Sequence, residues 1–140
     1  MTRYVVDSSV VIKWSVPEVH SDDALRYLDP AIERHAPELL LAEVANILWK
    51  KTGRGEITPD EAARIAGDVR QSAITIHPMG ALFGPAPTIA IATGRSAYDS
   101  LYLALAESLS TSMVTADRRL DNALQGSGYE QLVLWIEDGP

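Results

Sequence analysis

The sequence predicts an α/β fold, a three-layer α/β/α sandwich around a central parallel sheet, formed as a single domain over residues 1–140. Short apolar runs typical of buried strands alternate with longer amphipathic stretches typical of helices, which is the pattern of a parallel sheet covered on both faces. The chain has 140 residues, of which 46% are hydrophobic. This is enough for one sizeable core and too little for two ordinary domains.

Turn residues, helix caps and the spacing of apolar residues place the individual elements. Strands are expected at residues 3–6, 73–77, 112–116 and 132–136. Helices are expected from Asp7 to Pro17, from Ser21 to Pro30, from Pro37 to Gly53, from Thr58 to Gln71, from Ser96 to Glu107 and from Arg118 to Leu124. A further short helix is expected to end at Gly94. The start at Thr58 is marked by a capping box, because Pro59 and Glu61 follow it at the first and third helical positions.

The composition excludes several classes of function. The chain has no cysteine, and His20, His35 and His77 are not at metal-ligand spacing, so thiolate chemistry and zinc sites are not expected. No apolar run reaches the roughly 20 residues that span a bilayer, and the first residues lack a secretory signal, so we expect a cytoplasmic protein without membrane contact. A net charge of −7 argues against a broad basic face for nucleic acid, but not against an acidic pocket rimmed by a few basic residues.

Four acidic residues stand where the fold favours apolar or loop residues. Asp7 and Asp117 directly follow the apolar runs 4–6 and 113–116, which places them at the carboxyl ends of two predicted strands. In an open α/β sheet, ligands bind in the crevice outside these ends. Glu43 and Asp99 lie inside apolar helical stretches. Each acid also has a purely structural interpretation: Asp7 and Asp117 as helix caps, Asp99 within a capping box and Glu43 at an exposed helix edge.

The energetics of bringing these four acids together distinguish the two interpretations. Two ionised carboxylates about 5 Å apart repel by about 3 kcal/mol at an effective dielectric constant of about 20. A domain is stable by only about 5–15 kcal/mol. A cluster of four is therefore tolerated only with a bound divalent cation or with raised pKa values. Carboxylate oxygens favour a hard cation such as Mg²⁺ or Mn²⁺.

Four motifs in order along the chain resemble those of PIN-domain ribonucleases, in particular the VapC-type toxins of prokaryotic toxin–antitoxin pairs. The motifs are Val5-Val6-Asp7-Ser8-Ser9, the segment from Pro37 to Asn46, the segment from Ala97 to Glu107, and Val114-Thr115-Ala116-Asp117-Arg118-Arg119-Leu120. The resemblance implies a Mg²⁺- or Mn²⁺-dependent endoribonuclease that hydrolyses RNA phosphodiester bonds. It also implies a cognate VapB-type antitoxin, whose C-terminal segment lies near the active site, and a homodimer.

The resemblance assigns roles to particular residues. Asp7, Glu43, Asp99 and Asp117 match the four acidic active-site positions of the family. The resemblance makes Asp7, Asp99 and Asp117 metal ligands, and Glu43 either a metal ligand or a group that orients the attacking water. Ser9 and Thr115 match small hydroxyl residues near the pocket, where such groups orient carboxylates.

Other residues near these motifs have open roles. Lys13, Lys50, Arg95, Arg118 and Arg119 are candidates for phosphate contacts. Trp14 and Trp49 stack on bases, line a groove for a partner or belong to the core. Asp121 either extends the acidic pocket or faces solvent.

A non-catalytic alternative stays open, either a PIN-like binding protein or a receiver-like metal-binding regulatory module. Receiver domains resemble one another in a paired acid after the first strand and a lysine after the last strand. Here Ser8 and Ser9 follow Asp7, and Lys51 is the last lysine of the chain. Ser9 also replaces the second acid of the Asp-x-Asp motif that a haloacid-dehalogenase-type phosphatase requires. Because all four acids are present, the sequence favours the enzyme.

Overall fold

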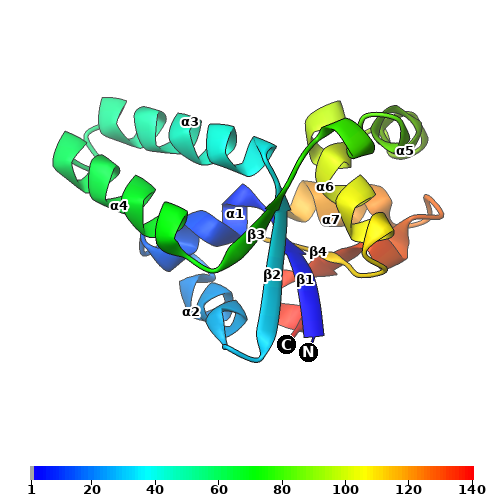
Figure 1. Ribbon diagram of the computed structural model, residues 1–140, viewed down its shortest axis with the longest axis horizontal. Coiled ribbons are helices and arrows are strands. Elements are labelled where there is room, and N and C mark those ends of the chain that lie inside the picture. Colours follow the sequence, from blue (N-terminus) through cyan, green and yellow to red (C-terminus); the bar gives the residue numbers. More distant parts are fainter. Residues whose placement is uncertain (1) are drawn as a thin grey trace.

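The computed structural model describes residues 2–140, so Met1 of the expected domain lies outside the described residues. These residues form a five-stranded, wholly parallel sheet in the order β3-β2-β1-β4-β5 (Figure 1). The strands are β1 (Thr2–Val6), β2 (Ile32–Pro37), β3 (Ile74–His77), β4 (Met113–Thr115) and β5 (Val133–Trp135). The predicted parallel α/β architecture is confirmed.

Helices cover both faces of this sheet and complete the three predicted layers (Figure 1). One side carries α1 (Ser8–Val11), α2 (Ser21–Leu25), α3 (Leu39–Gly53) and α4 (Pro59–Gln71), and the other carries α5 (Pro85–Thr93), α6 (Ala97–Ser108) and α7 (Arg118–Leu124). Short 3-10 turns follow α1 at Ile12–Trp14 and α2 at Arg26–Leu28, and others lie at Gly80–Leu82, Glu130–Leu132 and, labelled η5, at Ile136–Asp138. Across residues 2–140, no helix is long and apolar enough to cross a membrane.

The core is centred on β1 and α6. Val5 and Val6 are fully buried at the end of β1, and residues 102–106 of α6 are buried without interruption. Helix α6 contacts β1 and β2 on one side and α5 on the other, which explains why its sequence is apolar all round. An acid in the first turn of such a helix lies at the boundary of the core.

The predicted caps are present. The Thr58 hydroxyl accepts the N–H of Glu61 at 3.1 Å, and the Glu61 carboxylate accepts the N–H of Thr58 at 3.1 Å, which completes the capping box of α4. Gly94 ends α5 in the left-handed conformation, with φ of 73°, which glycine adopts without strain. Ser96 caps α6 by accepting the N–H of Asp99.

The expected helix start at Pro37 is wrong, and the sequence patterns predict no strand where the structure has β2. Pro37 is the last residue of β2, and α3 begins two residues later. The strand was missed because it carries Glu33, Arg34 and His35 in succession. Arg34 is nevertheless buried, since its guanidinium donates to the carbonyl oxygens of Tyr27 and Asp29 at 2.8 and 3.2 Å.

Candidate active site

The parallel sheet brings the two acids that follow strands to the same edge. Asp7 comes directly after β1, and Asp117 follows the adjacent strand β4, with Val6 paired to Val114 at the end of the ladder. Glu43 lies in α3 and Asp99 in the first turn of α6. The four predicted acids therefore come from both helical layers and from the carboxyl ends of the central strands.

Asp7 is buried, with 6% of its surface exposed. Its Oδ1 accepts the backbone N–H of Val10 at 3.1 Å and the hydroxyl of Ser9 at 2.5 Å, while its Oδ2 accepts the hydroxyl of Thr115 at 2.7 Å. The bond to Val10 is the helix cap that the structural interpretation expects. The two hydroxyl bonds go beyond capping, because they fix the orientation of both carboxylate oxygens.

Ser9 and Thr115 are themselves held by the backbone of the strand-to-helix turn. The Ser9 oxygen accepts the N–H of Ala116 at 3.1 Å, and the Thr115 oxygen accepts the N–H of Asp117 at 3.0 Å. Since each hydroxyl accepts a backbone N–H, its own hydrogen is free to donate to Asp7. Both residues thus contact Asp7 as the sequence predicts, and they link it to the turn that carries Asp117.

Burial is the main influence on the protonation of Asp7. It raises the pKa of this carboxyl from 3.8 to about 6, although the hydrogen bonds from Ser9, Thr115 and Val10 act in the opposite direction. The negative charge of Glu43 adds to the rise. A cation close to Asp7 would favour the charged form of this buried carboxyl group, because opposite charges stabilise each other.

Glu43 is half-buried and accepts a hydrogen bond of 2.6 Å from the Tyr102 hydroxyl. Tyr102 is 1% exposed, so its hydroxyl has little access to other partners and orients Glu43 firmly. Burial raises the pKa of Glu43, the tyrosine bond lowers it, and the charge of Asp99 raises it again. The influence of Asp99 on Glu43, and of Glu43 on Asp7, indicates that these three carboxylates share one electrostatic environment.

Arg95 joins the remaining two acids. Its Nε and Nη2 donate to Oδ2 of Asp99 at 3.2 and 3.0 Å, and Nη2 lies 3.6 Å from Oδ2 of Asp117. The backbone N–H of Asp99 is capped by Ser96, but its side chain turns to Arg95 instead of completing a capping box. Asp117 also caps α7, since its Oδ1 accepts the N–H of Arg119 at 3.0 Å.

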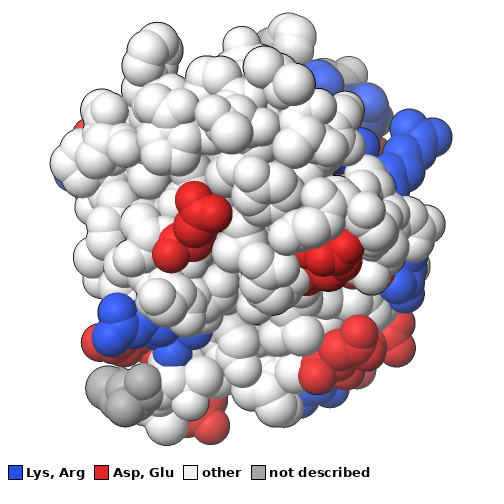
Figure 2. All heavy atoms as spheres, turned by 90° about the vertical axis from the view of Figure 1, so that its right-hand side faces the viewer, with Lys and Arg blue, Asp and Glu red and all other residues white. Residues whose placement is uncertain are grey.

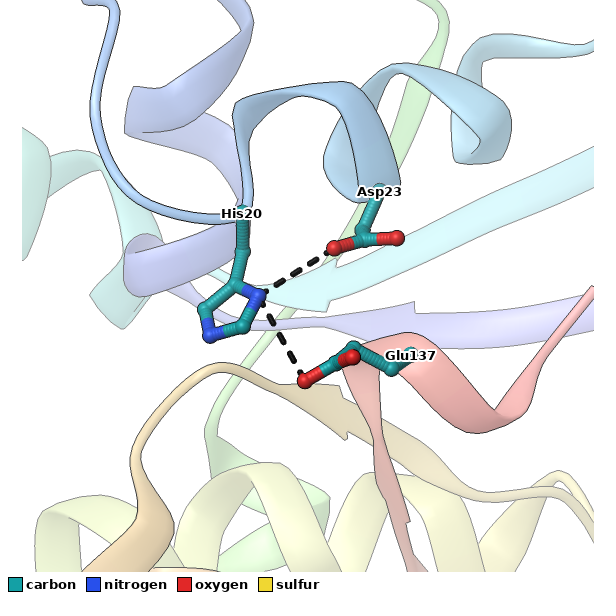
Figure 3. Close-up of side chains that lie close together, drawn as sticks. All are labelled: His20, Asp23 and Glu137. Carbon is teal, nitrogen blue, oxygen red and sulfur yellow. Dashed lines mark hydrogen bonds and ion pairs between the residues drawn. The ribbon is translucent and has the colours of Figure 1, made fainter.

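A tighter cluster of metal-ligand residue types lies elsewhere. His20, Asp23 and Glu137 are the only group of three within residues 2–140 whose ligand atoms all lie within 4.8 Å of one another (Figure 3). Their lone pairs are engaged, because Nδ1 of His20 is 3.1 Å from Asp23, Arg26 donates to Asp23 at 2.9 Å, and Trp135 donates to Glu137 at 3.1 Å. This group ties η5 to α2 and is separate from the predicted acids.

Among the basic residues named from the sequence, the two lysines lie in a different place from Arg118. Lys13 and Lys50 line a groove of about 360 Å³ that also contains Ser9. Arg118 is held by Asp121 at 2.9 Å, and its guanidinium lies 3.6 Å above the centre of the Trp135 ring. Asp121 therefore pairs with Arg118 and does not join the four acids.

The two tryptophans named from the sequence also differ. Trp14 is partly buried, and its indole N–H donates to the carbonyl of Ala24 at 2.9 Å. Trp49 is 71% exposed on α3, so the core interpretation is wrong for Trp49.

Tyr102 is a site residue that the sequence patterns do not single out, because they mark it only as an apolar neighbour of Asp99. Its position three residues after Asp99 places both side chains on the same face of α6, which was the available signal. Lys51 and Arg54, which line the same groove as Lys13 and Lys50, were also not predicted as site residues.

The fold and site define a class of α/β proteins that gather acidic side chains at the carboxyl edge of a parallel sheet. Residues 4–123 match the PIN domain, and the chain belongs to the PIN-domain family. The chain is 35% identical over 120 residues to Ribonuclease VapC3 from Pyrobaculum aerophilum, in an alignment that covers 84% of this chain and 92% of that relative.

Solved structures share the fold. A crystal structure of a Pyrobaculum aerophilum protein matches with a TM-score of 0.70 at 24% identity and covers 97% of this chain and 85% of that chain. A toxin–antitoxin complex from Klebsiella pneumoniae matches with a TM-score of 0.67 at 14% identity. The match covers 94% of this chain and 95% of that chain. At these identities the likeness concerns the fold alone.

Proposed function

We propose that this protein is a metal-dependent endoribonuclease that acts in the cytoplasm as the toxin of a toxin–antitoxin pair. The observation that carries the proposal is Asp7, a buried carboxylate with both oxygens oriented by hydroxyl groups, in one electrostatic environment with Glu43 and Asp99. The name of the Pyrobaculum relative supports ribonuclease activity. The likeness to a toxin–antitoxin complex from Klebsiella supports a cognate antitoxin as partner, and we propose that it is of the VapB type.

The residues present fit a hard divalent cation. Asp7, Glu43, Asp99 and Asp117 offer only carboxylate oxygens, which Mg²⁺ and Mn²⁺ prefer. The guanidinium between Asp99 and Asp117 is further support, because it indicates that positive charge is stabilised at this point. When bound, such a cation supplies charge neutralisation for the phosphate and activation of a water molecule.

The side chains of the protein have distinct parts in this scheme. Asp7, Asp99 and Asp117 would hold the cation, while Ser9 and Thr115 keep the oxygens of Asp7 in place. Glu43 is oriented by Tyr102 and would hold the cation or position the attacking water. Because hydroxyl donors fix Asp7 and Glu43, little rearrangement of these two carboxylates is needed at the moment of reaction.

A basic groove beside the acids supports RNA as the substrate. Lys13, Lys50, Lys51 and Arg54 line the groove that contains Ser9. Within residues 2–140, Glu18 is the acid that faces this groove, and it lies 3.7 Å from both Lys13 and Lys51. The groove thus carries a net positive charge on a chain of net charge −7, and a phosphate backbone would be attracted to it.

Cleavage by the purified protein tests the proposed function. We expect cleavage of one or more RNAs from a panel of structured RNAs with Mg²⁺ or Mn²⁺, none with EDTA, and none with Asp99→Asn purified in the same way. Asp68→Asn, which changes an exposed acid on α4, is the matched control and should retain activity.

Equal cleavage by wild type and Asp99→Asn would contradict the assignment of the site. Tight binding of Mn²⁺ without cleavage of any RNA would favour the non-catalytic binding module.

We also propose that two copies associate through an uncharged surface around α5, formed by Phe83 before the helix, Ile91 within it and Tyr98 in the first turn of the adjacent α6. These side chains are 77%, 85% and 64% exposed, and no charged residue occurs between Arg70 and Arg95 in the sequence. Figure 2 shows this side of the molecule, where a wide area carries only isolated acidic groups. Since copies of an acidic chain repel through their charged faces, an uncharged helix is the surface that they can share about a two-fold axis.

The mass of the protein in solution tests this surface. We expect a dimer by light scattering during size-exclusion chromatography, and a monomer for Ile91→Asp, because the new charge would be buried in the interface. Val19→Asp changes another exposed apolar residue, 76% exposed in the loop before α2, and should leave the dimer intact. A monomeric wild type would refute the proposal.

A further inference from the structure

Arg95 is the residue of the site that the proposed mechanism leaves without a part. Within the described chain, it is the only lysine or arginine that forms an ion pair with any of the four acids. Its Nε and Nη2 both donate to Asp99 Oδ2, and Nη2 lies within 3.6 Å of Asp117 Oδ2. Arg95 is a candidate for a phosphate contact from its sequence position, but Asp99 already accepts from two of its donors.

The backbone around Arg95 is fixed, while its side chain reaches solvent. Gly94 ends α5 with φ of 73°, and Ser96 caps α6, so Arg95 stands on a connection between two well-defined helix ends. The N–H of Arg95 donates to the Thr93 hydroxyl at 3.3 Å. Its side chain is 23% exposed. A guanidinium on a long side chain at the surface is able to turn away from its partners without a change in the backbone.

The guanidinium and a divalent cation would both draw on the carboxylates of Asp99 and Asp117. An arginine is always charged and has only hydrogen-bond donors, so it cannot act as a ligand beside a metal. A cation held by Asp99 and Asp117 would repel a guanidinium that keeps its contacts with these carboxylates. The two cations therefore compete, and occupation by one weakens the binding of the other.

We propose that Arg95 is an internal competitor of the metal, which neutralises Asp99 and Asp117 until a divalent cation displaces it. This inference rests on the proposed metal site. It has two consequences: Arg95 stabilises the carboxylate cluster when no metal is supplied, and it lowers the affinity of the cluster for metal. Once displaced, its donors become available to a phosphate group of the RNA.

The affinity for Mn²⁺ alone tests the proposal without any RNA. We would measure it by isothermal titration calorimetry, and by electron paramagnetic resonance of free Mn²⁺, at constant pH and ionic strength. Arg95→Gln is expected to bind Mn²⁺ about tenfold more tightly than the wild type. Its melting temperature should be lower than that of the wild type in EDTA and should rise more on addition of Mn²⁺.

Two further variants make the experiment specific. Arg118→Gln removes the same charge next to Asp117, but Arg118 pairs with Asp121 and lies over Trp135, so its Mn²⁺ affinity should change less than about twofold, as for an exposed charge. Arg95→Lys keeps the charge without the planar fork of donors. It should give an intermediate affinity, and it provides a second measurement if Arg95→Gln does not fold.

Unchanged Mn²⁺ affinity in Arg95→Gln and Arg95→Lys would overturn the inference while leaving the proposed metal site intact. Weaker binding in these variants would also overturn it, since Arg95 would then orient Asp99 as a ligand. If folded wild type and variants all fail to bind Mn²⁺, both this inference and the proposed metal site are wrong.

Discussion

Asp7→Asn is expected to lower the rate of RNA cleavage by about 1000-fold, because it removes a charged ligand from the proposed metal site and leaves its position unchanged. The asparagine carbonyl still accepts one of the bonds that Asp7 accepts from Ser9 and Thr115, so the fold should be retained. The measurement is kcat/KM for RNA, with circular dichroism as the test of folding. Mg²⁺ should also no longer raise the melting temperature.

The same substitution is expected to stabilise the protein in EDTA. Folding raises the pKa of Asp7 from 3.8 to about 6, so the folded protein binds the proton more tightly than the unfolded chain. Above pH 6 the ionised carboxylate therefore destabilises the fold by about 3 kcal/mol, at about 1.4 kcal/mol per pKa unit. We expect a gain of about 1–2 kcal/mol from asparagine, since its amide group replaces one acceptor oxygen.

This stability difference has a defined dependence on pH. As the pH falls from 6 to 4, folded wild type takes up a proton at Asp7, and the advantage of Asp7→Asn should disappear. Urea denaturation of both proteins at pH 4.5 and 7.5 measures the change. Asp121→Asn is the matched control, because Asp121 pairs with Arg118. This variant should keep the cleavage activity of the wild type. Full activity in folded Asp7→Asn would refute the assignment.

Thr115→Val is expected to destabilise the protein by about 2–3 kcal/mol and to lower cleavage by about 10- to 100-fold. Valine has the shape of threonine but lacks the hydroxyl, which is fully buried and donates to Asp7 at 2.7 Å while accepting the N–H of Asp117 at 3.0 Å. The substitution leaves the Asp7 carboxylate without this donor and the N–H of Asp117 without this acceptor. Urea denaturation and kcat/KM for RNA measure the two effects.

Thr115→Ser separates the hydroxyl from the rest of the side chain. Serine keeps the hydroxyl and loses one buried methyl group, so we expect most of the activity to return while about 1 kcal/mol of stability is lost. If the valine and serine variants were equally active, the bond from Thr115 to Asp7 would have no part in catalysis.

Much of the fold was predictable because its signals are local. The capping box at Thr58, the glycine at position 94 and the cap at Ser96 mark helix ends through interactions within a few residues. Strand β2 was missed because its burial depends on a distant contact, the bonds from Arg34 to the carbonyls of Tyr27 and Asp29. A polar strand becomes recognisable only when the partners of its side chains are known.

The positions of the acids were predictable for a similar reason. Asp7 and Asp117 end apolar runs, and parallel strands bring such ends to one edge. The partner of Glu43 was not predictable, because Tyr102 is 59 residues away in the sequence. The role of Arg95 was also hidden, since nothing near it in the chain indicates that its guanidinium reaches Asp117 as well as Asp99.

The sequence by itself determined the parallel α/β class, the family and most helix ends, because apolar periodicity, capping residues and short motifs express these locally; its assignment of the four acids to the site stays a prediction. Only the tertiary structure decided which donors hold each carboxylate, which basic residues share a groove with Ser9, and which cation lies between Asp99 and Asp117. These contacts join residues from different layers of the sandwich, and such pairings depend on the packing of the whole chain.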